Sequence, residues 1–232
     1  MTKLIGRRDM LMGGLAAGAV AALPMRANAQ QLTLPVLDLA PVSPAVAMPV
    51  SPPVVATDSP DYRRRLLAAA VRETQRLSGK VWRSDVVGIA DFALPSSQPR
   101  LHFVKPADGS VRSFYVSHGK GSDPEHDGWL KSFSNVPGSF ATSRGAYLTC
   151  EWYSGKYGTS IRLVGLDGDN SAALDRAIVV HPAVYADPGM IGRWGKLGRS
   201  EGCFAMAPAE FNEALWHLSG GRLLFADRIG LG

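Results

Sequence analysis

One short stretch constrains this chain more than any other: Gly198–Met206, which reads GRSEGCFAM. Its cysteine, Cys203, follows a glycine inside a turn-forming run and precedes three apolar residues. The glycine permits a tight or positive-φ backbone and removes side-chain bulk beside the sulfur. Backbone N–H groups in such a turn can converge next to the thiol, as a nucleophile that generates an oxyanion requires. The alternative interpretation is an ordinary core cysteine, since free thiols are often buried.

The candidate partner of Cys203 is His181, which ends the β-branched run of residues 178–180. A histidine at the end of a buried strand is held rigidly, as a general base must be. A cysteine and a histidine within hydrogen-bond reach form an activated thiol, and we expect the imidazole to lower the thiol pKa. The alternative is a core histidine bonded to a carbonyl.

The hydrophobic pattern from Val81 onward has a period of two and predicts a mainly β domain. Segments rich in Gly, Pro, Asp and Ser separate the expected strands, as turns do. The expected strands are Val86–Phe92, Arg100–Lys105, Val111–His118, Ala146–Trp152, Ser160–Val164, Ala177–His181 and Leu223–Ile229.

Two peripheral helices are expected beside these strands. The first covers Asp61–Leu77, because Ser59 or Asp58 can cap it, Pro60 suits its first turn, and Gly79 can end it. The second covers Ala209–Leu218.

Length and composition indicate one ordinary globular domain, with 232 residues of which 46% are hydrophobic and 19% charged. We place this domain at residues 61–232. Part of the net charge of +5 lies in the first 29 residues, and no basic run is interleaved with aromatic residues, so no nucleic-acid partner is expected. The two cysteines, Cys150 and Cys203, could form a disulfide in an exported protein, but pairing would inactivate a nucleophile.

The first 60 residues predict export. Residues 1–29 resemble a twin-arginine signal, with Arg7 and Arg8 before a weakly apolar stretch and a small-x-small site at Ala27–Ala29. This segment would contact the membrane export machinery, and the domain would act in the periplasm. An uncleaved anchor is the alternative. Residues 30–60 are rich in proline and predict an extended linker.

The order of these motifs resembles the YkuD-type L,D-transpeptidases, in the branch called murein L,D-transpeptidase catalytic domain proteins. The similarity extends from about Val86 to Met206. Two departures stand out: Glu201 replaces the histidine of the widespread Ser-His-Gly-Cys motif, and Ala205 replaces an Asn or Arg. The stretches that carry the resemblance are ADFALPSSQPRL, VSHGKGSD, FSN, GSFATSRGAY, YSGKYGTSIRLVGLDGDN, RAIVVHPAVY and GRSEGC.

The resemblance implies a β-sandwich domain that crosslinks peptidoglycan stem peptides without a cofactor. Cys203 would attack a stem peptide to form a thioester, His181 would move the proton, and N–H groups around Glu201 and Gly202 would hold the oxyanion. Donor and acceptor stem peptides would be the partners, and a monomer is expected. Hydrolysis of the same thioester would make the protein an L,D-carboxypeptidase.

Six further residues are candidates for substrate binding: His118, Arg199, Ser200, Asn135, Ser143 and Tyr185. For His118 the alternative is a turn-stabilising role, and for Arg199 it is a guanidinium that bridges loop carbonyls. Tyr185 and Trp194 lie between His181 and Cys203 in a possible lid, although packing explains both equally well.

Two other classes of protein stay open. His118, Asp123, His126 and His181 are zinc ligands by residue type, but no HExxH or His-x-His spacing supports a metallopeptidase. A non-catalytic wall-binding module would keep the scaffold, but the Cys–His pair argues against it.

Overall fold

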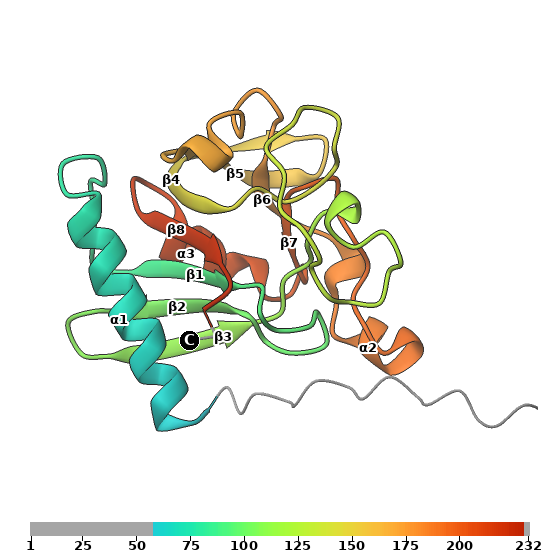
Figure 1. Ribbon diagram of the computed structural model, residues 1–232, viewed down its shortest axis with the longest axis horizontal. Coiled ribbons are helices and arrows are strands. Elements are labelled where there is room, and N and C mark those ends of the chain that lie inside the picture. The colour runs from blue at the N-terminus through green and yellow to red at the C-terminus, as the bar shows by residue number, and fades with distance from the viewer. Residues whose placement is uncertain (1–57, 230–232) are drawn as a thin grey trace, which may run out of the picture. The chain divides into compact units, whose positions relative to one another are not determined.

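The computed structural model describes residues 58–229, in which eight strands form one mixed sheet (Figure 1). The strands are β1 (Val87–Asp91), β2 (Leu101–Lys105), β3 (Ser110–Phe114), β4 (Gly145–Gly155), β5 (Gly158–Gly165), β6 (Val179–Pro182), β7 (Phe204–Met206) and β8 (Leu223–Asp227). The helices are α1 (Pro60–Arg76), α2 (Gly189–Trp194) and α3 (Phe211–Leu218), with 3-10 turns η1 (Lys120–Ser122), η2 (Gly168–Asn170) and η3 (Val184–Ala186).

The strand order is β3-β2-β1-β8-β4-β5-β6-β7, and two pairs, β1 with β8 and β6 with β7, are parallel. The two ends of this sheet approach each other, because the chain just after β3 forms a bridge to β7. The N–H of Ser117 donates to the carbonyl of Ala205 at 2.8 Å. The sheet therefore curls back on itself, and its last strand is held from both sides.

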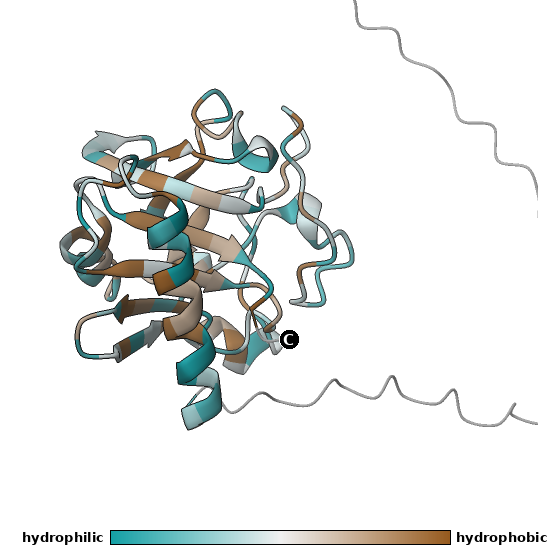
Figure 2. Ribbon diagram, turned by 60° about the vertical axis from the view of Figure 1, so that its left-hand side comes forward, coloured by the Kyte–Doolittle hydropathy of each residue, from teal (hydrophilic) through white to brown (hydrophobic). Residues whose placement is uncertain are grey.

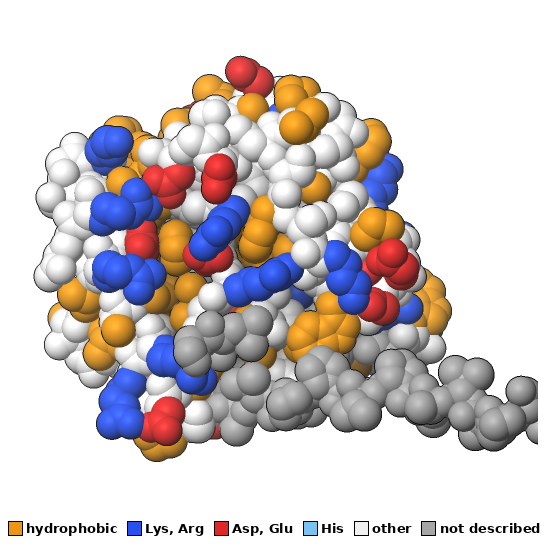
Figure 3. Space-filling model, viewed as in Figure 1, with side chains coloured by type: hydrophobic (Ala, Val, Ile, Leu, Met, Phe, Trp, Pro, Cys, Tyr) orange, Lys and Arg blue, Asp and Glu red, His pale blue; other side chains and the backbone are white. Residues whose placement is uncertain are grey.

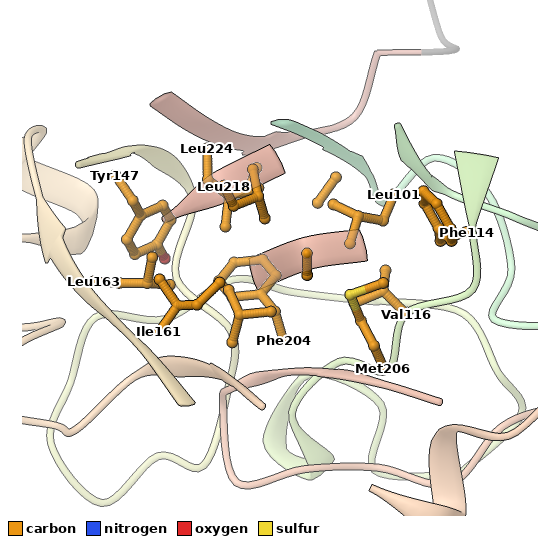
Figure 4. Close-up of a cluster of buried hydrophobic side chains, with 14 of the residues drawn as sticks. Leu101, Phe114, Val116, Tyr147, Ile161, Leu163, Phe204, Met206, Leu218 and Leu224 are labelled. Atoms are coloured by element: carbon orange, nitrogen blue, oxygen red, sulfur yellow. The ribbon is translucent and has the colours of Figure 1, made fainter. Parts of the chain in front are cut away.

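The main hydrophobic core lies inside this curl and draws side chains from both ends of the sheet (Figure 4). Phe204 of β7 is fully buried there. Its ring centroid lies 5.4 Å from that of Tyr147 on β4 and 6.1 Å from that of Phe92, which follows β1. The core is thus enclosed between opposite halves of one sheet, as the core of a sandwich is enclosed between two sheets. The prediction of a mainly β domain is confirmed.

Helix α1 covers the outer face of the sheet at β1, β2 and β8. Ser59 caps it as expected, since its hydroxyl accepts the N–H of Tyr62 at 3.2 Å, and Pro60 is its first residue. Side chains alternate across a strand, so Ile89 of β1 packs in the cluster under α1 while Ala90 faces the main core with α3. Figure 2 shows brown hydrophobic segments on the central strands and teal hydrophilic segments along α1.

Two elements were not expected: the three-residue strand β7 and the short helix α2. β3 also ends at Phe114 instead of reaching His118. These segments are too short for periodicity to identify, since a strand of three residues shows barely one full alternation. Tertiary pairing with β6 defines β7.

Basic and acidic side chains are interspersed on the face of the protein shown in Figure 3. The basic triplet Arg63–Arg65 is exposed, and Arg64 pairs with Asp61 on its own helix.

Within residues 58–229, no helix has the length and apolar character needed to cross a bilayer. The predicted signal and all but the last three residues of the predicted linker lie outside the described residues.

Packing of α1 on the sheet predicts a cost for truncating its buried side. Leu66 is fully buried, so Leu66→Ala is expected to lower the free energy of unfolding by about 3 kcal/mol. The control is Val71→Ala on the same helix, where the residue is 36% exposed and the expected loss is below about 1 kcal/mol. Urea unfolding measures both, and equal losses would contradict this packing.

Candidate functional site

Two adjacent parallel strands, β6 and β7, position His181 and Cys203. Cys203 immediately precedes β7, and His181 lies in β6 opposite Ala205. Because side chains alternate along a strand, the residue two positions before Ala205 projects from the same face as His181. Tyr185 borders both groups: its ring lies edge-on to the imidazole at 6.4 Å between centroids, and the thiol helps to raise its pKa. The sheet register therefore sets His181 opposite Ala205, two residues after Cys203, and Tyr185 neighbours both groups.

The thiol of Cys203 is largely buried, with 7% of the residue exposed. Its Sγ donates to the carbonyl of Ala177 at 3.6 Å. Burial raises its pKa above the ordinary value, opposed by a backbone hydrogen bond at Val179 and by the charge of Arg176. The expectation that the imidazole lowers the thiol pKa is corrected: burial dominates, and the thiol is protonated at neutral pH.

The imidazole of His181 is held in one tautomer. Its Nδ1 lies 3.0 Å from the carbonyl oxygen of Pro182, which can only accept, so Nδ1 carries the proton and Nε2 keeps its lone pair. The ring of Tyr157, at the β4–β5 turn, stacks on the imidazole with 4.4 Å between centroids. Burial lowers the pKa of His181, although the bond to Pro182 opposes this shift. A neutral imidazole with a free Nε2 can accept a proton from a thiol.

Ser200 closes the turn that carries Cys203. Its hydroxyl donates to the carbonyl of Cys203 at 2.6 Å and accepts the N–H of Gly202 at 3.2 Å. The backbone of Ser200 also bonds to the neighbouring loop. Its N–H donates to the carbonyl of His118, and its carbonyl accepts from the N–H of Lys120. Ser200 is buried, so its observed role is to shape the turn, in place of the expected substrate contact.

Gly202 is required by the shape of this turn. Its φ is +118°, which L-residues with a side chain rarely adopt. A Cβ at this position would lie 2.8 Å from the carbonyl oxygen of Ala141 and 2.8 Å from Cδ1 of Ile178. The space at Gly202, the residue before Cys203, therefore has no room for a side chain.

The two predicted oxyanion residues differ in their surroundings. The N–H of Gly202 already donates to the Ser200 hydroxyl. The side chain of Glu201 is exposed and pairs with Lys120 at 2.7 Å, and this hydrogen bond lowers the pKa of Glu201. The Glu201 carboxylate therefore lies on the rim of the site, held by a lysine.

His118 lies in a buried polar network instead of lining the site. Its Nδ1 accepts from Nη2 of Arg100 at 2.6 Å, and its Nε2 faces Oδ2 of Asp123 at 3.3 Å. Only 1% of His118 is exposed, and burial together with Arg100 lowers its pKa to about 4. The expectation that His118 contacts the substrate is therefore corrected in favour of the turn-stabilising alternative.

Three other predicted binding residues also bond within the protein. Arg199 donates to the loop carbonyls of Asp123 and Pro124, which is the bridging alternative stated above. Asn135 links its loop to η2 through Gly168, Ser171 and Ala172. The buried Ser143 donates to the carbonyl of Ser134 and accepts from Arg176 at 2.5 Å. Asn135 still lines a surface cavity with Phe133, Arg144 and Asp169.

Of the predicted lid residues, Tyr185 packs against the cysteine turn and Trp194 faces outward. A Cβ on Gly198 would lie only 2.6 Å from Cβ of Tyr185, so the two backbones approach closely there. Burial, followed by the Cys203 thiol, raises the pKa of Tyr185 well above its ordinary value. Trp194 ends α2 with 55% of its surface exposed.

The alternative chemistries find no geometric support. Both cysteines are free thiols, and Cys150 lies on β4, away from β7 in the strand order. Among the residues that the structure describes, no three His, Cys, Asp or Glu side chains gather closely enough to hold a metal ion. His126, one of the four proposed zinc ligands, instead bonds the carbonyl of Leu197.

Sequence reasoning did not single out two residues beside the pair. Tyr157 and Arg176 entered the sequence analysis only as members of the stretches YSGKYGTSIRLVGLDGDN and RAIVVHPAVY. Turn composition carries no signal for a ring that stacks on a distant histidine. Arg176 could have been noticed as a lone cation next to the apolar strand that precedes the histidine.

The comparisons identify the family. A family model described as the L,D-transpeptidase catalytic domain, of YkuD type, matches residues 58–226. The chain therefore belongs to the L,D-transpeptidase catalytic domain family, as the resemblance predicted.

Several solved structures are similar at low identity. An L,D-transpeptidase from Mycobacterium smegmatis matches at 17% identity over 62% of this chain and 58% of that chain, with a TM-score of 0.38. The LD transpeptidase LdtMt1 in complex with imipenem matches at 13% identity over 62% and 59%, with a TM-score of 0.38. The helical cell shape determining protein Pgp2 from Campylobacter jejuni matches at 14% identity over 71% and 56%, with a TM-score of 0.40. The chain thus covers less than two thirds of each of these chains, and no curated protein matches it.

The tight passage at Gly202 predicts a steric cost on substitution. Gly202→Ala adds a Cβ against backbone in addition to the positive φ, whereas Gly138→Ala, at φ +77°, meets nothing within 4 Å. We expect Gly202→Ala to lower the free energy of unfolding by about 1–3 kcal/mol more than Gly138→Ala. Urea unfolding of both variants measures this difference. Equal losses would mean that the turn has room for a side chain.

The stacked Tyr157 predicts a pH effect. Because burial lowers the pKa of His181, the imidazole of the wild type stays neutral until the pH falls below the ordinary value of about 6.5. Below the lowered pKa of His181 the imidazole is protonated and can no longer accept the proton of the Cys203 thiol. Tyr157→Ala exposes the ring to water, so we expect the pKa of His181 to rise toward 6.5 in an NMR titration. An unchanged or lower pKa would show that Tyr157 does not shield the imidazole.

Proposed function

We propose that the protein is a cysteine-dependent L,D-transpeptidase that crosslinks peptidoglycan stem peptides through a thioester on Cys203. The observation that supports this proposal is the register of β6 and β7, in which His181 lies opposite Ala205, two residues after Cys203, in a domain of this family. The donor and the acceptor are both stem peptides, as the family resemblance implies.

In the first half-reaction, Sγ of Cys203 attacks the carbonyl carbon of the donor peptide bond while its proton passes to Nε2 of His181. The C–N bond then breaks, and the imidazolium gives the proton to the leaving amine. Because burial keeps the thiol protonated, attack and proton transfer are coupled. The thiol also leaves its hydrogen bond with Ala177 as it turns toward the substrate.

In the second half-reaction, an amine of the acceptor stem attacks the thioester carbonyl. His181 takes a proton from this amine and returns it to the departing sulfur, which restores the thiol. Water in place of the amine would give a carboxypeptidase product by the same steps.

Backbone N–H groups of the cysteine turn stabilise the oxyanion of both half-reactions. The N–H of Gly202 is engaged by the Ser200 hydroxyl, so this role falls first on the N–H groups of Glu201 and Cys203. Tyr185 lies where it can border the bound stem, because it neighbours both the thiol and the imidazole.

Location in the periplasm is part of the proposal and rests on the sequence of residues 1–29, with its paired Arg7 and Arg8. Export in the folded state by the twin-arginine route would deliver the domain with its two thiols reduced. Periplasmic stem peptides would then be accessible to it.

Muropeptide analysis of sacculi incubated with the protein tests this function. We expect a new crosslink with the wild type and with Cys150→Ala, and at least about a 10³-fold loss with Cys203→Ala because the nucleophile is absent. The same product from Cys203→Ala would show that Cys203 is not the nucleophile.

Intact-mass spectrometry after incubation with imipenem separates an enzyme from a wall-binding module. The resemblance implies acylation by carbapenems, in which the β-lactam ring opens without a leaving group, so the adduct adds the whole mass of the drug. We expect this adduct on the wild type and none on Cys203→Ala.

A further inference from the structure

Arg176 is a partly buried cation without a carboxylate partner. Its guanidinium donates through Nη1 to the carbonyl of Ser134 at 2.8 Å and through Nη2 to the hydroxyl of Ser139 at 3.3 Å. It also bonds the carbonyl of Ala141 and the hydroxyl of Ser143. All four acceptors are neutral. Within residues 58–229, no Asp or Glu oxygen forms a salt bridge with this guanidinium, so its charge stays uncompensated.

This charge lies directly behind the cysteine turn. A Cβ on Gly202, the residue before Cys203, would be 3.3 Å from Nη2 of Arg176. The residue after Arg176 is Ala177, whose carbonyl accepts a hydrogen bond from the Cys203 thiol. Ala177 has a φ of +53°, an uncommon backbone conformation for a residue other than glycine. The segment 176–177 therefore bonds the Cys203 thiol through the carbonyl of Ala177 and places the charge of Arg176 beside Gly202.

The other charged and titratable groups near the thiol do not neutralise Arg176. The Glu201 carboxylate is exposed and held by Lys120. His181, on the adjacent strand, carries no negative charge in either protonation state. Tyr147 and Tyr185, which also neighbour the thiol, have raised pKa values and stay uncharged at neutral pH. The anion that can complement Arg176 is therefore the one that Cys203 forms when it loses its proton.

We propose that Arg176 is an electrostatic positioning residue, whose charge is fixed behind the Gly202–Cys203 turn to stabilise the Cys203 thiolate. A cation with only neutral acceptors is unfavourable in a partly buried place, and a nearby anion relieves that cost. All four described bonds run to the protein's own acceptors, so Arg176 acts through its field and not by holding the substrate. Its use in catalysis rests on the proposed function, whereas its effect on the thiol does not.

The rate of Cys203 alkylation by iodoacetamide as a function of pH tests this proposal without any wall substrate. The full chain with Cys150→Ser supplies a single reactive thiol. An opposite charge within a few ångströms lowers a pKa by roughly 1–3 units. We expect Arg176→Gln to raise the Cys203 pKa by about 1 unit, which makes alkylation about tenfold slower at pH below that pKa. Arg176→Lys keeps the charge and is expected to stay close to the wild type.

Arg228→Gln is the matched control, because Arg228 also donates to two neutral carbonyls, those of Leu130 and Lys131. It should leave the Cys203 pKa unchanged. A wild-type pKa in folded Arg176→Gln would overturn the proposal. If Arg176→Gln does not fold, Arg176→Lys decides: a wild-type pKa supports the role of charge, and a rise of about 1 unit assigns the effect to the lost hydrogen bonds.

The crosslinking assay gives an independent second readout. With Arg176→Gln, a loss of activity at neutral pH that recovers at alkaline pH is the expected signature of a raised thiol pKa. A loss that persists at every pH would indicate a structural defect and overturn the electrostatic role. Because alkylation needs no stem peptide, an inactive wild type would count against the proposed function and leave the test of Arg176 intact.

Discussion

The site depends on one short parallel pairing, that of β6 with β7. Val180 lies opposite Phe204 and His181 opposite Ala205, so a slip of one residue would turn the thiol away from the imidazole's face. Three interactions fix this register. Phe204 is locked into the core, the N–H of Ser117 bonds β7 from the other side, and the Ser200 hydroxyl closes the turn before the cysteine. A strand of three residues is thus held by its neighbours more than by its own sequence.

Burial controls the chemistry of the pair. It raises the pKa of Cys203 and lowers that of His181, so both groups are neutral at physiological pH. In the proposed mechanism, this neutral pair keeps Cys203 a thiol until a substrate arrives, and the proton then moves during the attack. The lone charge of Arg176 behind the turn reduces the cost of forming the thiolate at that moment. The surrounding hydrogen bonds, including the buried pairing of His118 with Asp123, hold the loops that frame this geometry.

The sequence predicted what local chemistry determines. The cap at Ser59 located the start of α1, alternation located most strands, and the glycine before Cys203 indicated the special backbone that the structure has there. Partners across the fold were not predictable in this way. His118 and Arg199 have the right residue types for substrate binding, but their bonds go to the protein's own loops. Nothing in a local pattern says where a distant carbonyl or carboxylate will lie.

The tautomer of His181 tests the central claim most directly, because only a lone pair on Nε2 can receive the proton of Cys203. ¹⁵N NMR of histidine-labelled protein at neutral pH measures it, with His181→Asn used to identify the signal among the five histidines. The bond from Nδ1 to the carbonyl of Pro182 predicts a proton on Nδ1 and an unprotonated Nε2. A proton on Nε2 with a bare Nδ1 would contradict the account.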